Sequence, residues 1–373
     1  MLTILSIFGT RPEAVKMVPL LKAFARRPDA IRSVVCSTGQ HREMLAQVLD
    51  LFAIRPDISL DIMEPDQNLA QVSATLLTEL DAIVERVQPD WILGVGDTTT
   101  VFAAAMVAHF RRALFGHVEA GLRTGDKWHP FPEEIFRRVA DFAADAYFAP
   151  TEHARGVLMR EGCPPEDVYL TGNTVVDALL DMAAQPYDWS RGPLAGLPLE
   201  GRIVFVTAHR RESFGQPFRE LCLAIRDLAE RFAAEGVQFV YPVHLNPNVQ
   251  APVRELLADL PNVHLLAPLD YHSLVQMLKR AALVLTDSGG IQEEAPTFGV
   301  PVLVMREATE RPEGLEANVA RLVGTSRQRI VSEAERLLRD PDAHAAMARG
   351  GNPYGDGHAA ERIMAILLER GAR

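Results

Sequence analysis

The chain has 373 residues, of which 48% are hydrophobic and 23% are charged, and its formal net charge is −11. This length and composition predict a globular protein of two domains and exclude a disordered chain. The acidic balance argues against a nucleic-acid partner, whose phosphates require a basic protein face.

Short apolar runs alternate with longer amphipathic stretches along the whole chain. In chain order, we predict strands at residues 3–8, 33–37, 91–95, 113–118, 146–149, 203–207, 238–242, 263–266, 283–286, 300–305 and 320–323. Most of these runs are continuously apolar, which predicts parallel sheets covered by helices on both faces. The segment 184–201 is rich in proline and glycine, so we expect it to link two doubly wound domains.

The cysteines and the N-terminus bear on location. Cys36, Cys163 and Cys222 are widely spaced and form no Cys-x-x-Cys pair, which is typical of a reducing cytoplasm. Residues 1–8 are apolar but short and lack a basic leader, so they predict a strand rather than a signal peptide. No apolar run is long enough to cross a bilayer. We therefore expect a cytoplasmic protein with no membrane partner.

Polar residues follow several strands of the first series. Arg11 and Lys16 indicate stabilisation of a phosphate or leaving group, although a capped helix with a solvated lysine explains them equally well. Asp97 follows a strand in a Gly-Val-Gly context without the third glycine of a dinucleotide site, so NAD is not favoured. It is either a catalytic carboxylate or a helix N-cap.

Two further groups of acids precede the middle of the chain. His117 and Glu119 project to the same side if the strand continues through them, and a buried glutamate requires a partner. Glu133 and Glu134 stand in the first turn of a predicted helix. Stabilisation by the helix dipole explains that pair adequately, so this feature alone favours the dipole over a functional role.

The second series of strands carries cationic and titratable groups. His209 is followed by two arginines at a strand end, which indicates an anion site with a titratable member. His244 and Arg311 follow later strands. No spacing of histidine, cysteine and acidic residues resembles a metal site, and neither a Walker loop nor a serine nucleophile elbow is present.

The segment from Ser288 to Gly290 is the most specific signal in the second half. It follows an apolar strand and opens a predicted helix, so several backbone N–H groups lack helical partners. These donors and the helix dipole favour a diphosphate. Glu294 lies one turn later, where a carboxylate can reach the hydroxyls of an attached sugar.

Ten segments, taken together and in order, resemble the non-hydrolysing UDP-N-acetylglucosamine 2-epimerases of bacteria. They are GTRPEAVKMVPL, TGQHREML, GDTTT, HVEAGLRTG, PEE, HRRESFG, PVHLNPNV, DSGGIQEEAP, GVPVLVMR and TERPE. The resemblance implies a GT-B architecture, with two Rossmann-like doubly wound parallel-sheet domains facing across a cleft. It implies domains of 1–172 plus 355–373 and of 173–354, with a C-terminal helix at 357–369 crossing back to the first domain.

The resemblance also implies a reaction. Members of that family interconvert UDP-N-acetylglucosamine and UDP-N-acetylmannosamine by eliminating UDP to give 2-acetamidoglucal and then adding UDP back. The product is a precursor of bacterial surface polysaccharide. No cofactor is required, because no hydride step occurs, and a homodimer is expected.

The resemblance assigns roles to individual residues. The implied catalytic residues are Lys16, Asp97, Glu119, Glu133 and His209, among which the acid and the base are not distinguished. The implied substrate-binding residues are Arg11, His244, Leu274, Ser288, Gly289, Gly290, Glu294 and Arg311. Leu274 stands where some relatives place an aromatic ring against uracil. Gln40, His41 and Arg42 are implied for a second, regulatory UDP-N-acetylglucosamine, although Asp66 stands where those relatives have arginine.

Three alternatives stay open at this point. A GT-B glycosyltransferase shares the diphosphate cradle and the ribose carboxylate, but simple transfer does not need the acidic trio of Asp97, Glu119 and Glu133. A 2-epimerase for a modified UDP-sugar would share all of these residues. A non-enzymatic UDP-sugar sensor would not need paired proton carriers.

Overall fold

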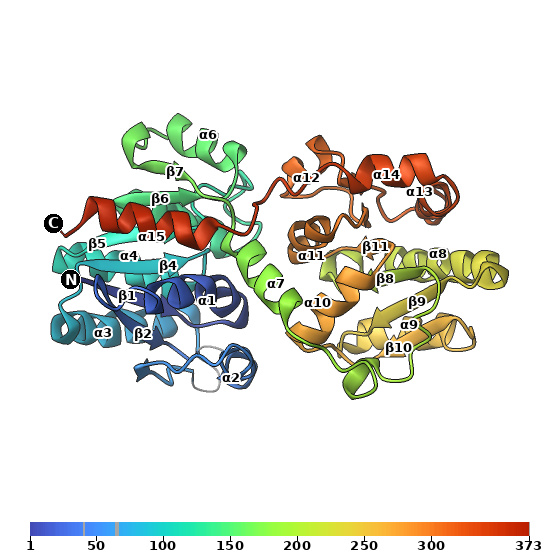
Figure 1. Ribbon diagram of the computed structural model, residues 1–373, viewed down its shortest axis with the longest axis horizontal. Coiled ribbons are helices and arrows are strands. Elements are labelled where there is room, and N and C mark those ends of the chain that lie inside the picture. Colours follow the sequence, from blue (N-terminus) through green and yellow to red (C-terminus); the bar gives the residue numbers. More distant parts are fainter. Residues whose placement is uncertain (40–41, 64–66, 373) are drawn as a thin grey trace. The chain divides into compact units, whose positions relative to one another are not determined.

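The protein divides into two compact units in a computed structural model that describes residues 1–39, 42–63 and 67–372. The first unit comprises Met1–Ala178 and Tyr354–Arg373, and the second comprises Leu179–Pro353. Figure 1 shows a sheet flanked by helices in each unit. The domain limits expected from the sequence, which differ from these by a few residues, stay a prediction.

The first unit is built on a seven-stranded parallel sheet with the order β3-β2-β1-β4-β5-β6-β7. Its strands are β1 Leu2–Phe8, β2 Ile31–Ser37, β3 Ile58–Ser59, β4 Trp91–Val95, β5 Leu114–Val118, β6 Ala146–Ala149 and β7 Val168–Leu170. Its helices are α1 Arg11–Ala25, α2 Arg42–Leu51, α3 Leu69–Val87, α4 Thr99–Arg111, α5 Glu133–Ala143, α6 Glu152–Arg160, α7 Thr174–Ala184, which runs on into the second unit, and α15 Ala359–Arg370.

The second unit repeats this plan with six parallel strands in the order β10-β9-β8-β11-β12-β13. These are β8 Ile203–Thr207, β9 Gln238–Pro242, β10 Val263–Leu266, β11 Leu283–Thr286, β12 Val302–Val304 and β13 Ala320–Leu322. The helices are α8 Gln216–Phe232, α9 Pro247–Leu257, α10 Tyr271–Arg280, α11 Gly289–Glu294, α12 Pro312–Glu316, α13 Arg327–Arg339 and α14 Pro341–Ala348.

Both sheets have a topological switch point, where the chain reverses the direction in which it adds strands. It lies between β1 and β4 in the first sheet and between β8 and β11 in the second. Doubly wound folds bind ligands beyond the carboxyl ends of the strands that flank such a point. The fold therefore directs attention to the loops after β1 and β4, and after β8 and β11.

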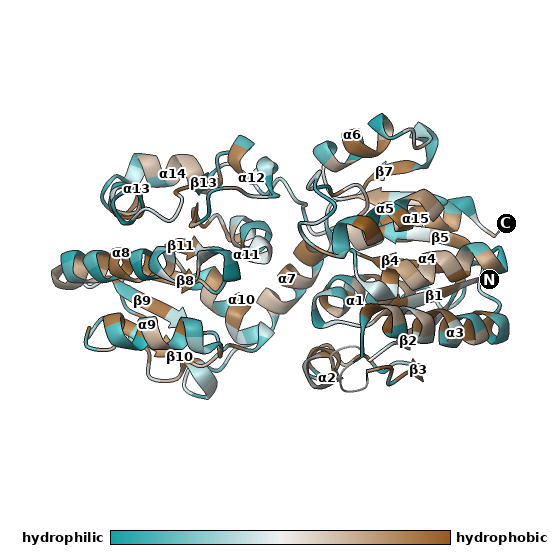
Figure 2. Ribbon diagram, turned by 180° about the vertical axis from the view of Figure 1, so that it is seen from behind, coloured by the Kyte–Doolittle hydropathy of each residue, from teal (hydrophilic) through white to brown (hydrophobic). Residues whose placement is uncertain are grey.

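Burial explains why these segments form strands. Every residue of β4 and of β5 is buried, and the strand residues appear brown between helices with teal outer faces in Figure 2. In the second unit, apolar residues of α8 and α13 join those of β8, β9 and β11 in one core. Strands with a helical layer on each side are apolar throughout, because both of their faces are buried.

The end of the chain returns to the first unit. Helix α15 packs against α1, and the Trp91 indole donates a hydrogen bond of 2.8 Å to the Gly371 carbonyl. Asp177 accepts the N–H of Ala360, in the first turn of α15, at 2.9 Å. These contacts, which join the last helix to β4 and to α7, place residues 354–373 within the first unit.

The expected parallel α/β fold is confirmed, with three differences of detail. Strands β3 and β7 were not predicted, since runs of two and three residues give no periodic signal. The third difference is the segment 184–201, which is not a free linker. Leu194 is buried in the apolar core of the second unit, beside the half-buried Tyr187 and Trp189.

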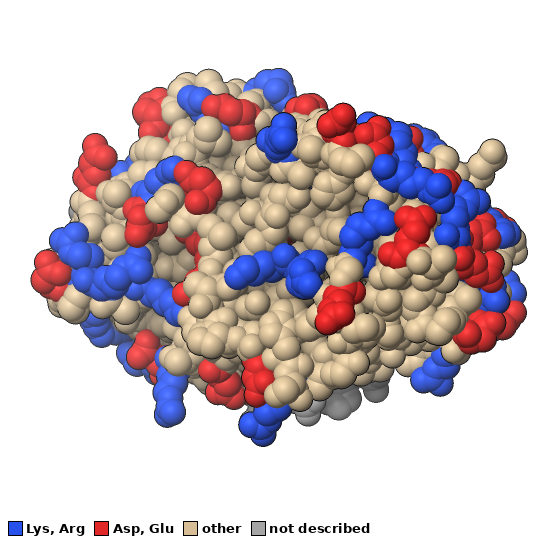
Figure 3. Space-filling view, turned by 45° about the vertical axis from the view of Figure 1, so that its right-hand side comes forward, with Lys and Arg blue, Asp and Glu red and all other residues tan. Residues whose placement is uncertain are grey.

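Charged residues cover the helices of both units. On the face shown in Figure 3, acidic and basic side chains are interspersed. Several form ion pairs, such as Arg219 with Glu255 at 2.6 Å and Arg226 with Asp259 at 2.9 Å. Within the described ranges, no helix has the length and apolar character needed to span a membrane.

Candidate functional site

Glu119 is the central carboxylate at the carboxyl edge of the first sheet. Strand β5 ends at Val118, and Glu119 has a left-handed backbone with φ of 66°. This conformation is uncommon for a residue with a side chain and typical of functional sites. The carboxylate is buried, forms an ion pair with Lys16 of α1 and accepts a hydrogen bond of 3.3 Å from the Asn173 amide. These two contacts compensate for the cost of burying the charged carboxylate.

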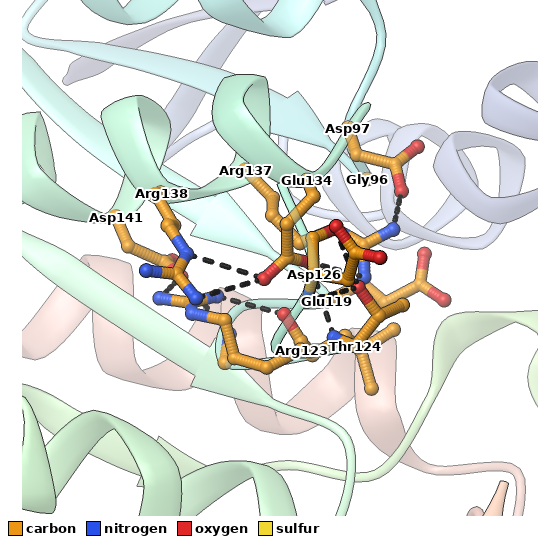
Figure 4. A network of polar contacts seen from close by, with 12 residues as sticks. Gly96, Asp97, Glu119, Arg123, Thr124, Asp126, Glu134, Arg137, Arg138 and Asp141 are labelled. Atoms are coloured by element: carbon orange, nitrogen blue, oxygen red, sulfur yellow. Dashed lines mark hydrogen bonds and ion pairs between the residues drawn. The ribbon is translucent and has the colours of Figure 1, made fainter. Parts of the chain in front are cut away.

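Asp97 follows β4 at the same edge. Its neighbour Thr98, and not Asp97, caps helix α4, because the Thr98 hydroxyl accepts the N–H of Thr100 at 3.2 Å. The carboxylate of Asp97 instead forms an ion pair with Arg137 of α5, as Figure 4 shows. The interpretation of Asp97 as an ordinary helix cap is therefore wrong, and its side chain is directed to the sheet edge.

The two acids at the start of α5 differ in their surroundings. Glu134 is completely buried, and it accepts hydrogen bonds from the Arg138 guanidinium at 3.0 Å and from the Thr124 N–H at 3.1 Å. Glu133 is half-buried, and within the described part of the chain its buried Oε2 has no hydrogen-bond partner. Glu134 is thus committed to the fold, whereas Glu133 keeps one carboxylate oxygen without a hydrogen-bond partner among the described residues.

Glu13 connects two loops at the switch point of the first sheet. Its Oε2 accepts the N–H groups of Gly9 at 2.9 Å and Thr10 at 2.7 Å, and its Oε1 accepts the hydroxyl of Thr98. With the Thr10 side chain it forms a capping box at the start of α1. The loop before α1, formed by Gly9 and Thr10, is therefore joined to the loop that carries Asp97.

His209 occupies the corresponding edge of the second sheet, after β8. Asp287, which follows β11, accepts the backbone N–H groups of His209 at 2.7 Å and Arg210 at 2.8 Å. The imidazole Nδ1 lies 3.6 Å from Asp287 Oδ1, and the ring stacks on His244 with centroids 5.3 Å apart. Burial lowers the pKa of His209, assisted by His244 and Arg210 against the opposing charge of Asp287. A neutral ring at this position can accept a proton.

Helix α11 opens at Gly289 beside a cationic side chain. Ser288 is the N-cap residue, and its N–H donates to the Thr286 hydroxyl at 2.9 Å. A Cβ atom on Gly289 would lie 3.3 Å from Cζ of Arg311, whose Nε donates to Glu293 at 2.8 Å. The glycine therefore lets a guanidinium approach the first turn of the helix, where the unpaired N–H groups also favour an anion.

The remaining predicted residues of the second unit lie near this helix or at the sheet edge. Glu294 is buried at the end of α11, and Leu274 of α10 is half-buried against the same apolar cluster as Ile291. His244 is exposed after β9, and its Nδ1 accepts the N–H of Asn246 at 3.1 Å.

Comparison with known proteins identifies the family. A family model described as UDP-N-acetylglucosamine 2-epimerase matches residues 22–368. The UDP-N-acetylglucosamine 2-epimerase of Escherichia coli K12 is 48% identical over 98% of each chain. A crystal structure of the Neisseria meningitidis UDP-GlcNAc 2-epimerase bound to UDP-GlcNAc is 40% identical, with a TM-score of 0.88 over 99% of this chain and 100% of that one. A putative enzyme of the same name from Listeria monocytogenes is 42% identical, with a TM-score of 0.91 over 99% and 96%.

The chain belongs to the UDP-N-acetylglucosamine 2-epimerase family. The resemblance seen in the sequence is therefore confirmed, and so is the expected architecture of two Rossmann-like units. Among the described residues, no group of three or more histidine, cysteine and acidic side chains is suited to hold a metal ion.

The structure brings the predicted residues of this epimerase-family chain into two groups. In the first unit, Lys16, Asp97 and Glu119 lie at one sheet edge, Arg11 is the first residue of α1 and Glu133 is the first residue of α5. Gln40 and His41 lie outside the described residues, and Arg42 begins α2, so the regulatory site stays a prediction.

Four supporting residues were not selected from the sequence. Arg137 and Asn173 contact the carboxylates from distant parts of the chain, which no local pattern reveals. Glu134 differs from Glu133 only in its tertiary surroundings. Glu13, unlike the other three, has a local sequence signal. Threonine followed three residues later by glutamate is the sequence pattern of a capping box.

The stability of Glu13 variants tests whether hydrogen bonds to this side chain hold the two loops together. Burial raises the pKa of Glu13 above 4.5 despite the hydrogen bonds from Thr98, Gly9 and Thr10. The folded protein therefore binds the Glu13 proton more tightly than the unfolded chain does. At pH 7 the ionised Glu13 lowers the free energy of unfolding, and this loss becomes smaller as the pH falls through the raised pKa. We expect Glu13→Gln to be at least as stable as the parent at pH 7, with an advantage that shrinks towards pH 4.5, in urea unfolding.

The control is Glu13→Ala, which removes the acceptors altogether. It should cost about 1–3 kcal/mol at both pH values, because the N–H groups of Gly9 and Thr10 lose their partner. A glutamine variant as unstable as the alanine variant would mean that the negative charge, and not the hydrogen bonding, holds the two loops.

Proposed function

We propose that this protein interconverts UDP-N-acetylglucosamine and UDP-N-acetylmannosamine by inverting C2. The observation that carries the proposal is the two carboxylates Asp97 and Glu119, which Arg137 and Lys16 hold at one sheet edge in a chain of this epimerase family. Glu133 begins α5, the helix that carries Arg137. The Escherichia coli relative is named for this activity, and the Neisseria meningitidis relative binds UDP-GlcNAc.

The chemistry explains why several carboxylates are needed. The C2 hydrogen has no neighbouring carbonyl to acidify it, so cleavage of the C1–O bond leads and places positive charge on the sugar ring. Loss of the C2 proton then gives 2-acetamidoglucal and UDP, and the reverse steps on the other face of C2 give the epimer. Carboxylates stabilise the cation and carry the proton. Proton transfer on two faces requires more than one such group.

The first unit supplies the proton carriers in this proposal. The Lys16 ammonium favours ionised Glu119, which is otherwise buried. Arg137 forms an ion pair with Asp97, and Glu133 has an oxygen without a hydrogen-bond partner among the described residues. We assign the acid and base roles to these three carboxylates as a group, together with His209, whose lowered pKa suits proton transfer.

The second unit binds UDP in this proposal. The N–H groups of Ser288, Gly289 and Gly290 would hold the diphosphate with Arg311, and Glu294 would accept the ribose hydroxyls. Leu274 would give the uracil an apolar contact, and His244 would contact the substrate beside His209. Arg11 and Lys16 would balance the charge of the departing UDP.

A glycosyltransferase activity is the alternative of another class, since GT-B transferases bind UDP-sugars with the same kind of cradle. A 2-epimerase for a modified UDP-sugar is the closer alternative. The clustered carboxylates favour epimerisation over transfer. We further propose a cytoplasmic role in supplying precursors of surface polysaccharide, in keeping with three free cysteines.

Incubation of the protein with UDP-N-acetylglucosamine in D₂O tests the function directly. We expect deuterium at C2 of both epimers and the appearance of the manno epimer in the proton spectrum. Intact C2–H with accumulating UDP would instead support hydrolysis or transfer. A modified substrate would be indicated by the absence of both changes together with tight binding of UDP.

Glu119→Gln is the control for this experiment. The variant removes the negative charge but keeps the shape, so C2 exchange should be lost while the affinity for UDP, measured by calorimetry, stays within about twofold. Equal loss of exchange and of UDP affinity would make Glu119 a structural residue.

Two adjacent glycines offer a matched test of the diphosphate cradle. A Cβ on Gly289 meets the Arg311 guanidinium at 3.3 Å, whereas a Cβ on Gly290 meets nothing within 4 Å. Gly289→Ala is therefore expected to weaken UDP binding by about tenfold, or 1.4 kcal/mol, and Gly290→Ala to weaken it by less than threefold. Equal affinities of the two variants, measured by calorimetry, would separate Arg311 from diphosphate binding.

We also propose that the protein is a homodimer that associates through α4 and α5. These helices pack against each other, yet Phe142 is 91% exposed, Phe110 is 57% exposed and Ile135 is 41% exposed. Large apolar side chains gathered on neighbouring helices are typical of an interface. Closed two-fold dimers are also the commonest soluble oligomers.

Light scattering tests the dimer. The parent should have twice the 41.1 kDa mass of one chain, and Phe142→Asp should shift it to the monomer mass, because a carboxylate cannot be buried there unpaired. Met159→Asp, at a position 43% exposed on α6, is the matched control and should stay dimeric. A parent of monomer mass would contradict the proposal.

A further inference from the structure

His117 is a buried titratable residue that the proposed chemistry does not use. It lies in β5 with no exposed surface, and its Nδ1 is 2.5 Å from Asp141 Oδ1. Its Nε2 is 2.7 Å from the carbonyl oxygen of Gly96. Both of these oxygens are acceptors, so both ring nitrogens must donate, and a neutral imidazole has only one N–H. The geometry therefore requires an imidazolium.

Asp141 is arranged to hold that charge. It is buried in α5, and its Oδ2 lies 2.7 Å from the Arg123 guanidinium and 3.2 Å from the Gly121 N–H. Burial opposes ionisation of Asp141, but His117 and Arg123 outweigh it, so the pKa of Asp141 is lowered. Burial likewise opposes protonation of His117, yet Asp141 and the Gly96 carbonyl raise its pKa. The pair is thus an ion pair, and Asp141 does not supply the missing proton.

The carbonyl that His117 holds belongs to the residue before Asp97. Gly96 has a left-handed backbone with φ of 80°, and its N–H donates to the Val118 carbonyl at 3.1 Å. A Cβ on Gly96 would lie 3.7 Å from Oε2 of Glu119. The peptide plane after Gly96 therefore sets where Asp97 begins, and it does so directly beside the Glu119 carboxylate.

His117 also lies on, or contacts, the elements that carry the other two carboxylates. Glu119 leaves β5 two residues after His117, and the chain must turn into a left-handed conformation there. Asp141 lies in the helix that begins with Glu133. One buried ring thus connects β4, β5 and α5, the three elements from which Asp97, Glu119 and Glu133 arise.

We propose that His117, held as an imidazolium by Asp141, is a positioning residue that fixes the Gly96 carbonyl and so sets the spacing of the carboxylates for proton transfer at C2. This inference rests on the proposed epimerase function. His117 does not touch the substrate. It acts through the backbone before Asp97 and through the exit of β5.

Two substitutions separate its hydrogen bonds. The amide nitrogen of Gln follows the position of Nε2, so His117→Gln keeps a donor for Gly96, whereas that of Asn follows Nδ1, so His117→Asn keeps a donor only for Asp141. A shift of about 1 Å in a catalytic group costs about 100-fold in rate. We expect kcat per UDP-binding site to fall about 100-fold in His117→Asn with KM within threefold, and less than tenfold in His117→Gln.

Three outcomes overturn the inference. They are a His117→Asn kcat within threefold of the parent, an equal loss in both variants, and a loss of kcat that disappears when rates are divided by the number of UDP sites. His153→Gln, at an exposed position on α6, is the control and should behave as the parent does. A parent that shows no C2 exchange would instead overturn the proposed function, which distinguishes the two failures.

Nitrogen NMR of the parent tests the charge without any variant. Both ring nitrogens of His117 should carry protons at pH 8, where exposed histidines are neutral. The signal is assigned by its absence from His117→Gln, or by its bond to Gly96 if that variant does not fold. A neutral His117 ring at pH 8 would overturn the proposal.

Discussion

A carboxylate that leaves water must be matched by a cation or by hydrogen-bond donors, and this constraint governs the edge of the first sheet. Glu119 is matched by Lys16, Asp97 by Arg137 and Asp141 by both His117 and Arg123. These pairings join β5 and the loops after β4 and β5 to helices α1 and α5, so satisfying the charges also connects these elements. The ion pairs therefore connect the loops of this edge to the helices around it.

The two units share one sheet topology but place different functional groups on it. In each sheet the functional loops follow the strands beside the switch point, where the helices diverge and leave the strand ends open. The first unit uses this opening for carboxylates. The second uses it for N–H groups, imidazoles and a guanidinium, which suit an anion. The two units therefore differ in the side chains that follow equivalent strands, and not in the arrangement of those strands.

Most of the fold could be predicted, because strands buried on both faces are apolar throughout and stand out from amphipathic helices. The exceptions have physical reasons. Strands β3 and β7 are too short to show a pattern. The expectation that His117 and Glu119 project to the same side assumed a continuing strand, but β5 ends at Val118 and the left-handed turn at Glu119 breaks the alternation.

The site was predictable to the extent that motifs record it. Asp97, Glu119 and His209 were selected because they follow predicted strands and stand in segments that resemble the epimerase family. Their partners were not, since the Arg137 pair spans 40 positions and depends on how α5 packs. The sequence does not show which of the two adjacent glutamates has an oxygen without a hydrogen-bond partner among the described residues. Only the packing around α5 distinguishes Glu133 from Glu134.

The return of residues 354–373 to the first unit has a consequence for synthesis on the ribosome. The second unit is continuous in sequence, so it can complete its core while the chain is still being made. The first unit, although most of it precedes the second, lacks the helix that covers α1 and the partner of the Trp91 indole until residues 359–371 have been made. The first unit is therefore completed after the second, and a chain that stops before α15 would leave α1 without its covering helix.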